Sequence, residues 1–261
     1  MKPNWLIYKP FSVLDYKRVL NGILKIKDKS IVVAGCVRDV PLDIFKNNMD
    51  KCCRLVSKFE QYKIIIIEND SRNPLDLKVK DENITLIQRK YGWPKLGNGR
   101  DFRRTFLMSQ IRNEYVQLIK DKYSSYDYVM IIDYDIYNWR IDGVLNSFGH
   151  NDWDMIGANG VQQVDNKELY YDTFALIEKE YKVYQRGVDK DRYDIGESLV
   201  PVLSCFGGIG IYSMPAFLSG NKYDTCSLDG NNSSEQCSLF CNMYKNGYKR
   251  VYINPNMIVI R

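Results

Sequence analysis

Two aspartates, Asp133 and Asp135, stand one residue apart at the end of an apolar run, in the stretch YDYVMIIDYDIYN (126–138). Adjacent side chains of an extended chain point to opposite faces, so residues two apart share a face. Two carboxylates in one cleft repel each other unless a cation joins them. Mg²⁺ and Mn²⁺ bind one or two carboxylates together with phosphate oxygens, so the pair predicts a site for a cation and a nucleoside diphosphate. A solvated turn after a strand is the other interpretation, because Asp-x-Asp alone occurs often by chance.

Polar residues suited to a nucleotide occur upstream of this pair. Glu68 and Asp70 end the apolar run in IIIIENDSRN (64–73), where they could bind a base or a ribose. An ordinary turn explains the same residues equally well. Arg112 lies on a stretch with helical spacing, and its guanidinium suits phosphate, although a solvated helix charge is the simpler reading.

One acid downstream lies among aromatic residues. Asp172 belongs to YYDTFAL (170–176). Aromatic rings stack on the apolar face of a sugar and a carboxylate binds its hydroxyls, so the segment suits a carbohydrate. Core packing by the aromatic residues is the alternative.

The elements that must position these residues alternate along the first half of the chain. Four short apolar runs rich in β-branched residues are typical of strands buried on both faces of a parallel sheet: 30–37, 62–70, 83–88 and 128–132. Between them, apolar residues recur at helical spacing over 41–59 and 102–119, with Pro41 in a first turn and Asp101 as a cap. This alternation predicts an α/β fold with a mostly parallel central sheet.

The second half has a different pattern. A glycine-rich strand is expected over SCFGGIGIYSM (204–214), a helix over EQCSLFCNMYKNGY (235–248) and short strands over RVYINPNMIVI (250–260). Strands no longer alternate strictly with helices. We see no internal repeat and no domain boundary, so one domain is expected.

Composition narrows the class of protein. The chain has 261 residues, 45% of them hydrophobic, and a net charge of +5 that is spread along the sequence, which predicts a globular protein without a nucleic-acid surface. Its seven cysteines form no repeated Cys-x-x-Cys pairs, so free thiols are favoured over a zinc site. No signal peptide is evident, and no run approaches the ~18 apolar residues of a membrane span. The composition, rich in Lys, Asn, Ile and Tyr, favours a cytoplasmic or viral setting.

Taken in order along the chain, several motifs resemble those of a GT-A-fold glycosyltransferase. They are ENDS, the RN of 112–113, DYD, YYDTFAL, FGGIGIYS (206–213) and SSEQCSLFCNMYKNGYKRVYINPNM (233–257). Within this fold, the motifs resemble those of the cryptococcal capsule mannosyltransferase family and its relatives in large DNA viruses. The resemblance implies a Rossmann-like, mostly parallel sheet flanked by helices, with a mixed C-terminal half. It implies a single domain over 1–261, with a helical N-terminal extension (1–29), a nucleotide-binding half (30–138) and a sugar- and acceptor-binding half (139–261).

The resemblance also implies roles for individual residues. Asp133 and Asp135 would hold Mn²⁺ or Mg²⁺, with Asp135 coordinating directly. The nucleotide sugar would be bound by Gly35, Val37, Arg38, Glu68, Asp70, Arg112, Asp133, Gly207 and Gly208. Glu235 and Asp172 would be the catalytic acids, although Glu235 could equally be an acid that stabilises a helix N-terminus. Ser234 and Gln236 stand where the family has Cys and His, which removes a histidine ligand; the only histidine, His150, is expected in a loop.

The activity that follows is metal-dependent transfer of a hexosyl group, with mannosyl transfer one option. The donor would be GDP-mannose or a UDP-sugar, and the acceptor a hydroxyl of a glycan or glycoprotein. An inverting enzyme would use Glu235 as base, whereas in a retaining one the leaving phosphate takes the proton. Two alternatives remain: a catalytically inactive carbohydrate-binding module on the same fold, and a sugar-phosphate nucleotidyltransferase, for which AGCVRDV (34–40) offers only one loop glycine.

Overall fold

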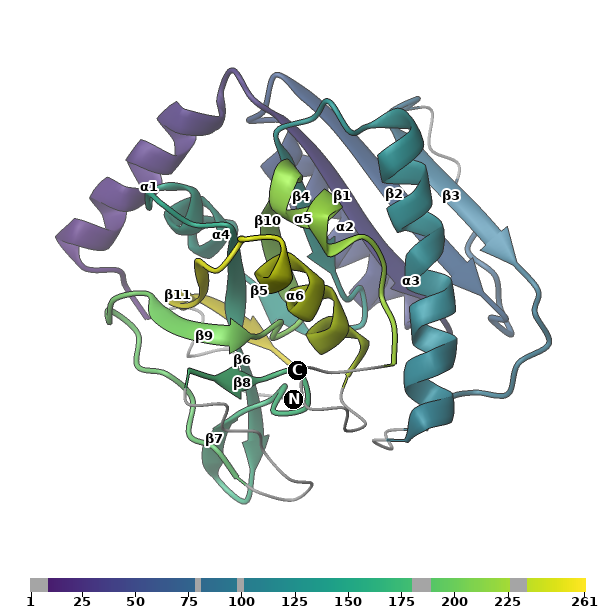
Figure 1. The fold of residues 1–261 in the computed structure, drawn as a ribbon. Helices are drawn as coiled ribbons and strands as arrows, with labels where there is room; N and C mark the ends of the chain where they lie inside the picture. Colours follow the sequence, from purple (N-terminus) through teal and green to yellow (C-terminus); the bar gives the residue numbers. More distant parts are fainter. Residues whose placement is uncertain (1–8, 78–80, 98–100, 180–188, 226–233) are drawn as a thin grey trace.

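The structure is a computed structural model that describes residues 9–77, 81–97, 101–179, 189–225 and 234–261. Within these ranges, eleven strands form one sheet. Nine follow the order β3-β2-β1-β4-β10-β6-β11-β9-β8, while β5 pairs with β11 and β7 pairs with β6. The sheet is twisted, and helices cover both of its faces (Figure 1).

The first half of the chain builds the parallel part of this sheet. Its strands are β1 (Ser30–Val37), β2 (Gln61–Asn69), β3 (Ile84–Arg89) and β4 (Tyr128–Ile132), and every pair among them is parallel. Two helices make the crossovers, α2 (Leu42–Val56) between β1 and β2, and α3 (Phe102–Lys122) between β3 and β4. All four predicted strands and both predicted helices are therefore present.

The second half adds strands of both directions. β10 (Ile209–Ser213) is antiparallel to β4 and to β6 (Met155–Val164), whereas β6 is parallel to β11 (Val251–Ile260). The remaining elements are β5 (Asn138–Trp139), α4 (Ile141–Phe148), β7 (Lys167–Tyr170), β8 (Ile177–Glu178), β9 (Val200–Ser204), α5 (Met214–Gly220) and α6 (Glu235–Lys245). β9 is antiparallel to β11 and to β8, so along the nine-strand path only β10 and β9 run against the other strands. The predicted α/β fold, with a mostly parallel sheet and a mixed C-terminal half, is confirmed.

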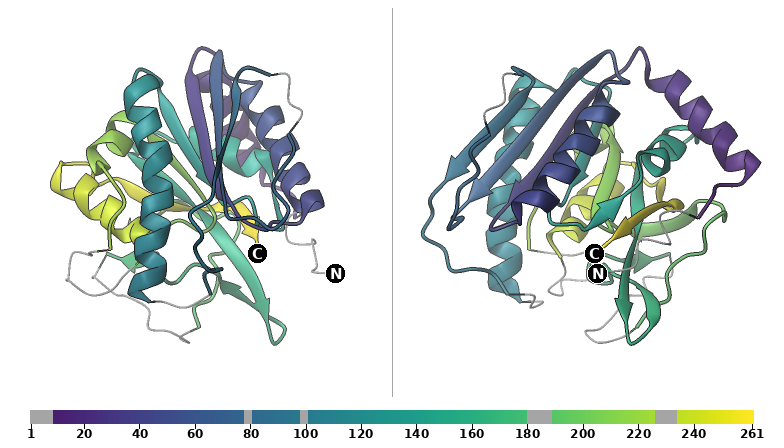
Figure 2. Two further views of the ribbon diagram at one scale, coloured as in Figure 1. Left: turned by 90° about the vertical axis from the view of Figure 1, so that its right-hand side faces the viewer. Right: turned by 180° about the vertical axis from the view of Figure 1, so that it is seen from behind.

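Two apolar cores lie on opposite faces of the sheet, and the strands alternate between them. Ile31 and Val33 of β1 face one core, and Val32 and Ala34 face the other; all four are 0% exposed. The first core lies under α1, α2 and α4, and the second under α3, α5 and α6 (Figure 2). Burial on both faces is why these strands are continuous apolar runs in the sequence. The six cysteines that the structure describes are free thiols, and Cys226 lies outside the described residues.

An N-terminal helix, α1 (Val13–Ile26), packs closely against α4. A Cβ added at Gly22 would lie 1.9 Å from the carbonyl oxygen of Leu145, and one added at Gly149 would lie 2.1 Å from that of Arg18. The two helices therefore touch through their backbones, at positions where any side chain would force them apart.

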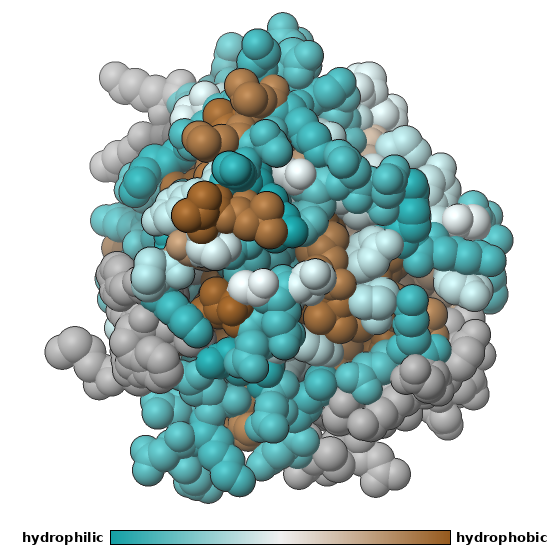
Figure 3. Space-filling view, turned by 90° about the vertical axis from the view of Figure 1, so that its left-hand side faces the viewer, coloured by the Kyte–Doolittle hydropathy of each residue, from teal (hydrophilic) through white to brown (hydrophobic). Residues whose placement is uncertain are grey.

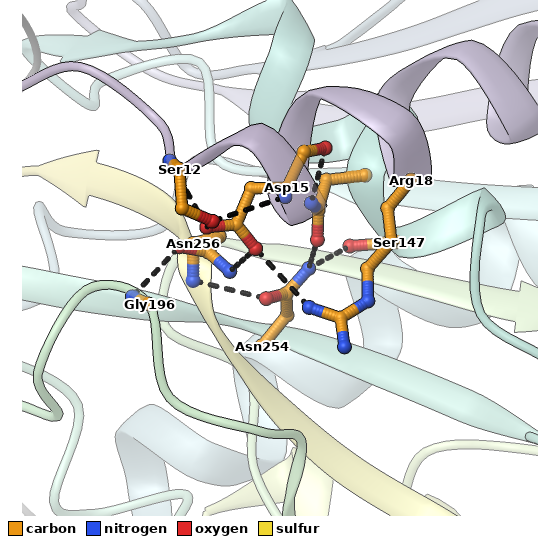
Figure 4. A network of polar contacts seen from close by, with 8 residues as sticks. Ser12, Asp15, Arg18, Ser147, Gly196, Asn254 and Asn256 are labelled. Atoms are coloured by element: carbon orange, nitrogen blue, oxygen red, sulfur yellow. Dashed lines mark hydrogen bonds and ion pairs between the residues drawn. The ribbon is translucent and has the colours of Figure 1, made fainter.

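A network of polar side chains joins α1 to α4 and β11 (Figure 4). The carboxylate of Asp15, which is 1% exposed, accepts hydrogen bonds from Ser12, from Arg18 at 3.1 Å and from the amide of Asn256 at 3.0 Å. Asn254 donates to Ser147 Oγ at 2.8 Å in the same network. These contacts supply hydrogen-bond partners for polar groups in the irregular part of β11, where its pairing with β6 is interrupted.

The solvent-facing side of α1 carries apolar side chains. Among the described residues, five of the nine large apolar side chains with the highest exposure belong to this helix: Val13, Leu14, Tyr16, Leu20 and Leu24. Figure 3 shows the face of the molecule that carries α1, with apolar side chains gathered on it. Hydrophobicity alone would therefore orient α1 wrongly, because its buried face includes Asp15 and Gly22. Across the described ranges, no helix combines the length and apolarity needed to cross a membrane.

Candidate active site

Four carboxylates from three parts of the chain meet at the carboxyl edge of the parallel strands. Asp133 and Asp135 directly follow β4, Asp172 follows β7, and Glu235 begins α6. Arg112 of α3 links two of them, with Nε 3.0 Å from Glu235 Oε1 and Nη2 3.2 Å from Asp133 Oδ1. The fold thus brings together acids that lie as much as 102 residues apart in the sequence.

A turn of two glycines connects Asp172 to Asp133. The backbone N–H of Gly207 donates to Asp172 Oδ2 at 3.1 Å, and the carbonyl of Gly208 accepts from the N–H of Asp133 at 2.9 Å. Both glycines have positive φ, +66° and +92°. A Cβ at Gly207 would lie 2.2 Å from the carbonyl oxygen of Ala158, so the missing side chain permits close approach of the protein's own backbone.

Arg112 is buried at the centre of the cluster and is 4% exposed, so the reading of this residue as a solvated helix charge is wrong. Its Nη1 donates to Tyr115 at 3.2 Å, and its guanidinium lies between the rings of Phe206 and Tyr223. Burial alone would lower the pKa of Arg112, but Tyr115, Asp133 and Glu235 raise it well above the usual value. Arg112 is therefore a permanent positive charge that fixes the positions of Asp133 and Glu235; direct contact with a donor phosphate stays a prediction.

Burial and mutual repulsion raise the pKa of two of the acids. Burial is the largest cause for Asp172, whose pKa rises to about 6; the Gly207 N–H opposes the shift, and the charges of Asp133 and Glu235 add to it. The pKa of Asp133 is raised mainly by burial, against the opposing effect of Arg112. Both carboxyls are therefore protonated more readily than they would be in water, and a cation nearby would favour their ionised form.

Asp135 is paired with Arg261, a residue that the sequence patterns did not identify. Both terminal nitrogens of the Arg261 guanidinium bond to the two carboxylate oxygens of Asp135, and its Cζ lies 5.1 Å from the Tyr171 ring centroid. The side chains are 44% exposed for Asp135 and 31% for Arg261. Arg261 belongs to no motif, and its only signal in the sequence is its position directly after the last apolar run.

These residues fit a divalent cation. Oε2 of Glu235 and both amide atoms of Gln236 are buried without a hydrogen-bond partner among the residues that the structure describes. The four carboxylates outnumber the two guanidiniums that pair with them, and hard cations prefer such oxygen ligands. Asp133 and Asp135 would hold the ion, and phosphate oxygens and water would complete its shell, since no group of three or more His, Cys, Asp or Glu in the described ranges forms a ready-made site.

His150 adds no ligand to this cluster. It follows α4 and lines a cavity of about 460 Å³ together with Tyr128, the first residue of β4, and Ser213, the last residue of β10. Asp133 follows the other end of β4, so His150 lies toward the opposite edge of the sheet. Burial, with help from Arg18 and Lys25, lowers the pKa of His150 to about 4.

The residues expected to bind the base and ribose have protein partners in the structure. Glu68 is 3% exposed and accepts from the Leu75 N–H at 3.0 Å and from Gln88 at 2.7 Å. Asp70 accepts from the Gly92 N–H at 2.8 Å. Glu68 therefore anchors the segment that follows β2, and Asp70 anchors the segment that follows β3; their binding of a nucleotide stays a prediction.

The other residues of the predicted nucleotide pocket also have structural partners. Arg38 donates to the carbonyls of Trp93, at 2.7 Å, and Pro94, at 2.9 Å. Gly35 lies in β1, beside the end of β4, where a Cβ would come 2.3 Å from the carbonyl oxygen of Ile132. Val37 is 2% exposed and packs in the core. Of the predicted pocket, four residues join the cluster of acids through hydrogen bonds: Arg112, Asp133, Gly207 and Gly208. The other five lie in β1 and β2 or just after them: Gly35, Val37, Arg38, Glu68 and Asp70.

Comparison with known proteins identifies the fold. No family model matches the chain, and no curated protein matches it in sequence. Among solved structures, it resembles a crystal structure of GalNAc-T7 with UDP, GalNAc and Mn²⁺, with a TM-score of 0.52 and 13% sequence identity over 89% of this chain. The match covers 43% of the GalNAc-T7 chain, so the present chain spans less than half of that protein's length. The fold is of the GT-A glycosyltransferase type, as predicted; the finer resemblance to capsule mannosyltransferases stays a prediction.

Proposed function

We propose that this protein is a glycosyltransferase that moves a hexosyl group from a nucleoside diphosphate sugar to a hydroxyl of a glycan or glycoprotein. The observation that carries the proposal is the convergence of four acids at the edge of the sheet where α/β folds bind ligands. Asp133 and Glu235 share Arg112 as a partner. The charge of Asp135 acts on Asp133, and the charges of Asp133 and Glu235 act on Asp172. The bound UDP, GalNAc and Mn²⁺ of the similar GalNAc-T7 structure support this class of donor and cofactor. The donor is GDP-mannose or a UDP-sugar, and the resemblance of the motifs favours mannose.

Asp133 and Asp135 define the diphosphate end of the site. Mn²⁺ or Mg²⁺ held between these carboxylates and the diphosphate would neutralise the charge that develops on the leaving group. Arg112 fixes the Asp133 carboxylate at 3.2 Å, so the protein orients this ligand before the donor arrives. A ligand fixed in advance costs less entropy on binding.

Asp172 is suited to bind the transferred sugar. The Gly207 N–H fixes one carboxylate oxygen, and the other can accept from a sugar hydroxyl. With its pKa near 6, Asp172 is mostly ionised at neutral pH and then acts as an acceptor.

Glu235 is suited to contact the acceptor hydroxyl. Arg112 binds its Oε1, while Oε2 is buried and has no partner in the described part of the chain. In an inverting reaction the bond from the anomeric carbon to the phosphate breaks, the acceptor oxygen bonds to that carbon, and Glu235 takes the hydroxyl proton. In a retaining reaction a phosphate oxygen takes the proton and Glu235 orients the acceptor.

A screen of nucleotide sugars tests this function. We expect one donor to raise the melting temperature in Mn²⁺ more than in EDTA and to be hydrolysed slowly in the absence of acceptor. Asp135→Ala should lower turnover by about 100-fold or more, the scale on which losing one charge-stabilising group acts. If no nucleotide sugar, UDP or GDP shifted the melting temperature at any metal concentration, the proposal would be wrong.

The same variant separates an enzyme from an inactive carbohydrate-binding module. A binding module would show equal glycan affinity with and without the Asp135→Ala substitution, and no turnover in either form. An enzyme would lose turnover in the variant while both forms stayed folded.

A further inference from the structure

We propose that Arg261 is an exchangeable counter-ion of the donor site: it neutralises Asp135 before the donor binds, and binds the donor diphosphate once a divalent cation takes its place on Asp135. This inference rests on the proposed function and assigns a ligand to a residue outside every motif. It starts from the bidentate pair between Arg261 and Asp135.

The pair places Arg261 in direct competition with a cation. The guanidinium uses both terminal nitrogens on both carboxylate oxygens, which are the atoms a cation would need. Asp135 is 44% exposed and Arg261 is 31% exposed, so water and dissolved cations can reach the pair. A cation that binds Asp135 therefore has to release this guanidinium.

Of the two guanidiniums that contact the acids, Arg261 is the one able to move. Arg112 is 4% exposed, uses Nε, Nη1 and Nη2 on protein partners and lies between two aromatic rings. Arg261 is instead partly exposed, and both of its terminal nitrogens bond to the one carboxylate of Asp135. A guanidinium keeps its charge when it changes partner, so it can bind an anion in place of Asp135.

The backbone holds Arg261 in place while its side chain turns. Its N–H donates to the Val161 carbonyl at 3.0 Å, and the preceding carbonyl, of Ile260, accepts from Tyr137 at 2.8 Å. The Tyr171 ring, 5.1 Å from the guanidinium carbon, offers a flat surface along which a cation–π contact can persist during rotation. A guanidinium binds phosphate with the same forked geometry as carboxylate, so exchange from Asp135 to a diphosphate needs no movement of the strand.

Binding of Mn²⁺ alone, measured by electron paramagnetic resonance on the full chain, tests the competition. We expect Arg261→Gln to bind Mn²⁺ about fivefold more tightly than the wild type in the absence of nucleotide, because the competing charge is gone. The matched control is Arg250→Gln, which removes a guanidinium from Asp154 at the opposite end of β11 and should leave Mn²⁺ affinity unchanged. Equal Mn²⁺ affinity of Arg261→Gln and the wild type would overturn the exchange.

Calorimetry with UDP and GDP at saturating Mn²⁺ tests the second part of the proposal, that Arg261 binds the donor diphosphate. Arg261→Gln should bind the diphosphate about tenfold more weakly, the loss expected for one charge-assisted hydrogen-bonding group, and Arg261→Lys should fall in between. Equal diphosphate affinity of Arg261→Gln and the wild type would remove the role in donor binding. If the wild type bound neither nucleotide at any Mn²⁺ concentration, the proposed function itself would fail, while the Mn²⁺ titration would still report the competition.

Discussion

At the scale of single residues, Arg112 determines the geometry of the acid cluster. One guanidinium contacts Glu235 through Nε and Asp133 through Nη2, so two carboxylates that would repel each other are held side by side. A lysine carries the same charge but lacks the fork. The arrangement therefore depends on the shape of the arginine as well as on its charge.

Two substitutions of Arg112 separate the effect of its forked shape from the effect of its charge. Arg112→Lys should fold but lower turnover by about 100-fold, because Asp133 and Glu235 lose their common partner. Arg112→Ala should lower the free energy of unfolding by about 3–5 kcal/mol, because the buried Glu235 carboxylate loses its counter-charge. Urea denaturation and turnover assays measure both effects. Wild-type turnover in Arg112→Lys would show that position matters less than charge.

Asp172 makes stability depend on pH in an unusual direction. Its pKa is raised to about 6 in the folded protein, so between the unfolded value and pH 6 the folded state binds more protons than the unfolded state. This contribution is present at low pH and is lost as pH rises through 6. In EDTA, Asp172→Asn should therefore gain stability relative to the wild type between pH 4 and pH 7, by on the order of 2 kcal/mol. Urea denaturation at the two pH values checks this, and an unchanged difference between variant and wild type would contradict it.

The acids could be found from the sequence, but their partners could not. Asp133 and Asp135 stand out by spacing, and Glu235 and Asp172 by motif resemblance. Arg112 and Glu235 are 123 residues apart, and Arg261 and Asp135 are 126 apart, so only the folded chain pairs them. The glycines were expected to let a ligand approach the backbone; at Gly35 and Gly207 the close neighbour in the structure is a backbone carbonyl of the protein itself.

At the scale of elements, buried strands are the easiest to predict and surface helices the hardest to orient. Continuous β-branched runs mark β1, β2 and β4 because both faces of these strands are buried. In α1 the pattern misleads: Leu20 and Leu24 are more than 60% exposed, whereas Asp15 is 1% exposed. The buried polar network and the contact through Gly22 orient this helix.

The contact between α1 and α4 predicts a large effect from a small substitution. Gly22→Ala should lower the free energy of unfolding by about 1–3 kcal/mol, because the added methyl would overlap the Leu145 carbonyl unless the helices separate. Asn21→Ala, at the adjacent exposed position, is the control and should stay within about 0.5 kcal/mol of the wild type. Thermal and urea denaturation compare the two, and equal stability of both variants would show that the helices can move apart without cost.

At the scale of the whole molecule, the class of fold followed from the order of the elements. Alternating strands and helices specify a parallel sheet, and that part of the fold was predicted strand by strand. In the second half the antiparallel insertion of β10 between β4 and β6 depends on contacts remote in sequence, which no local pattern encodes. The hydrogen bond from Asn256 to Asp15 spans 241 residues and ties the two ends of the described chain together. No local sequence pattern predicts this contact either.

The irregular segment of β11 holds residues that have no partner on β6. From Asn254 to Ile258 this strand advances four residues while β6 advances one, so three extra residues are accommodated there. The extra residues bulge out of the ladder and do not lengthen the strand along β6, so Ile258 could keep its present partner if all three were lost. Such a deletion would instead remove Asn256, whose amide donates to Asp15 of α1, and Met257, which packs in the first core. The length of this segment is therefore constrained by its ties to the N-terminal helix and to the core, and not by the register of the strand.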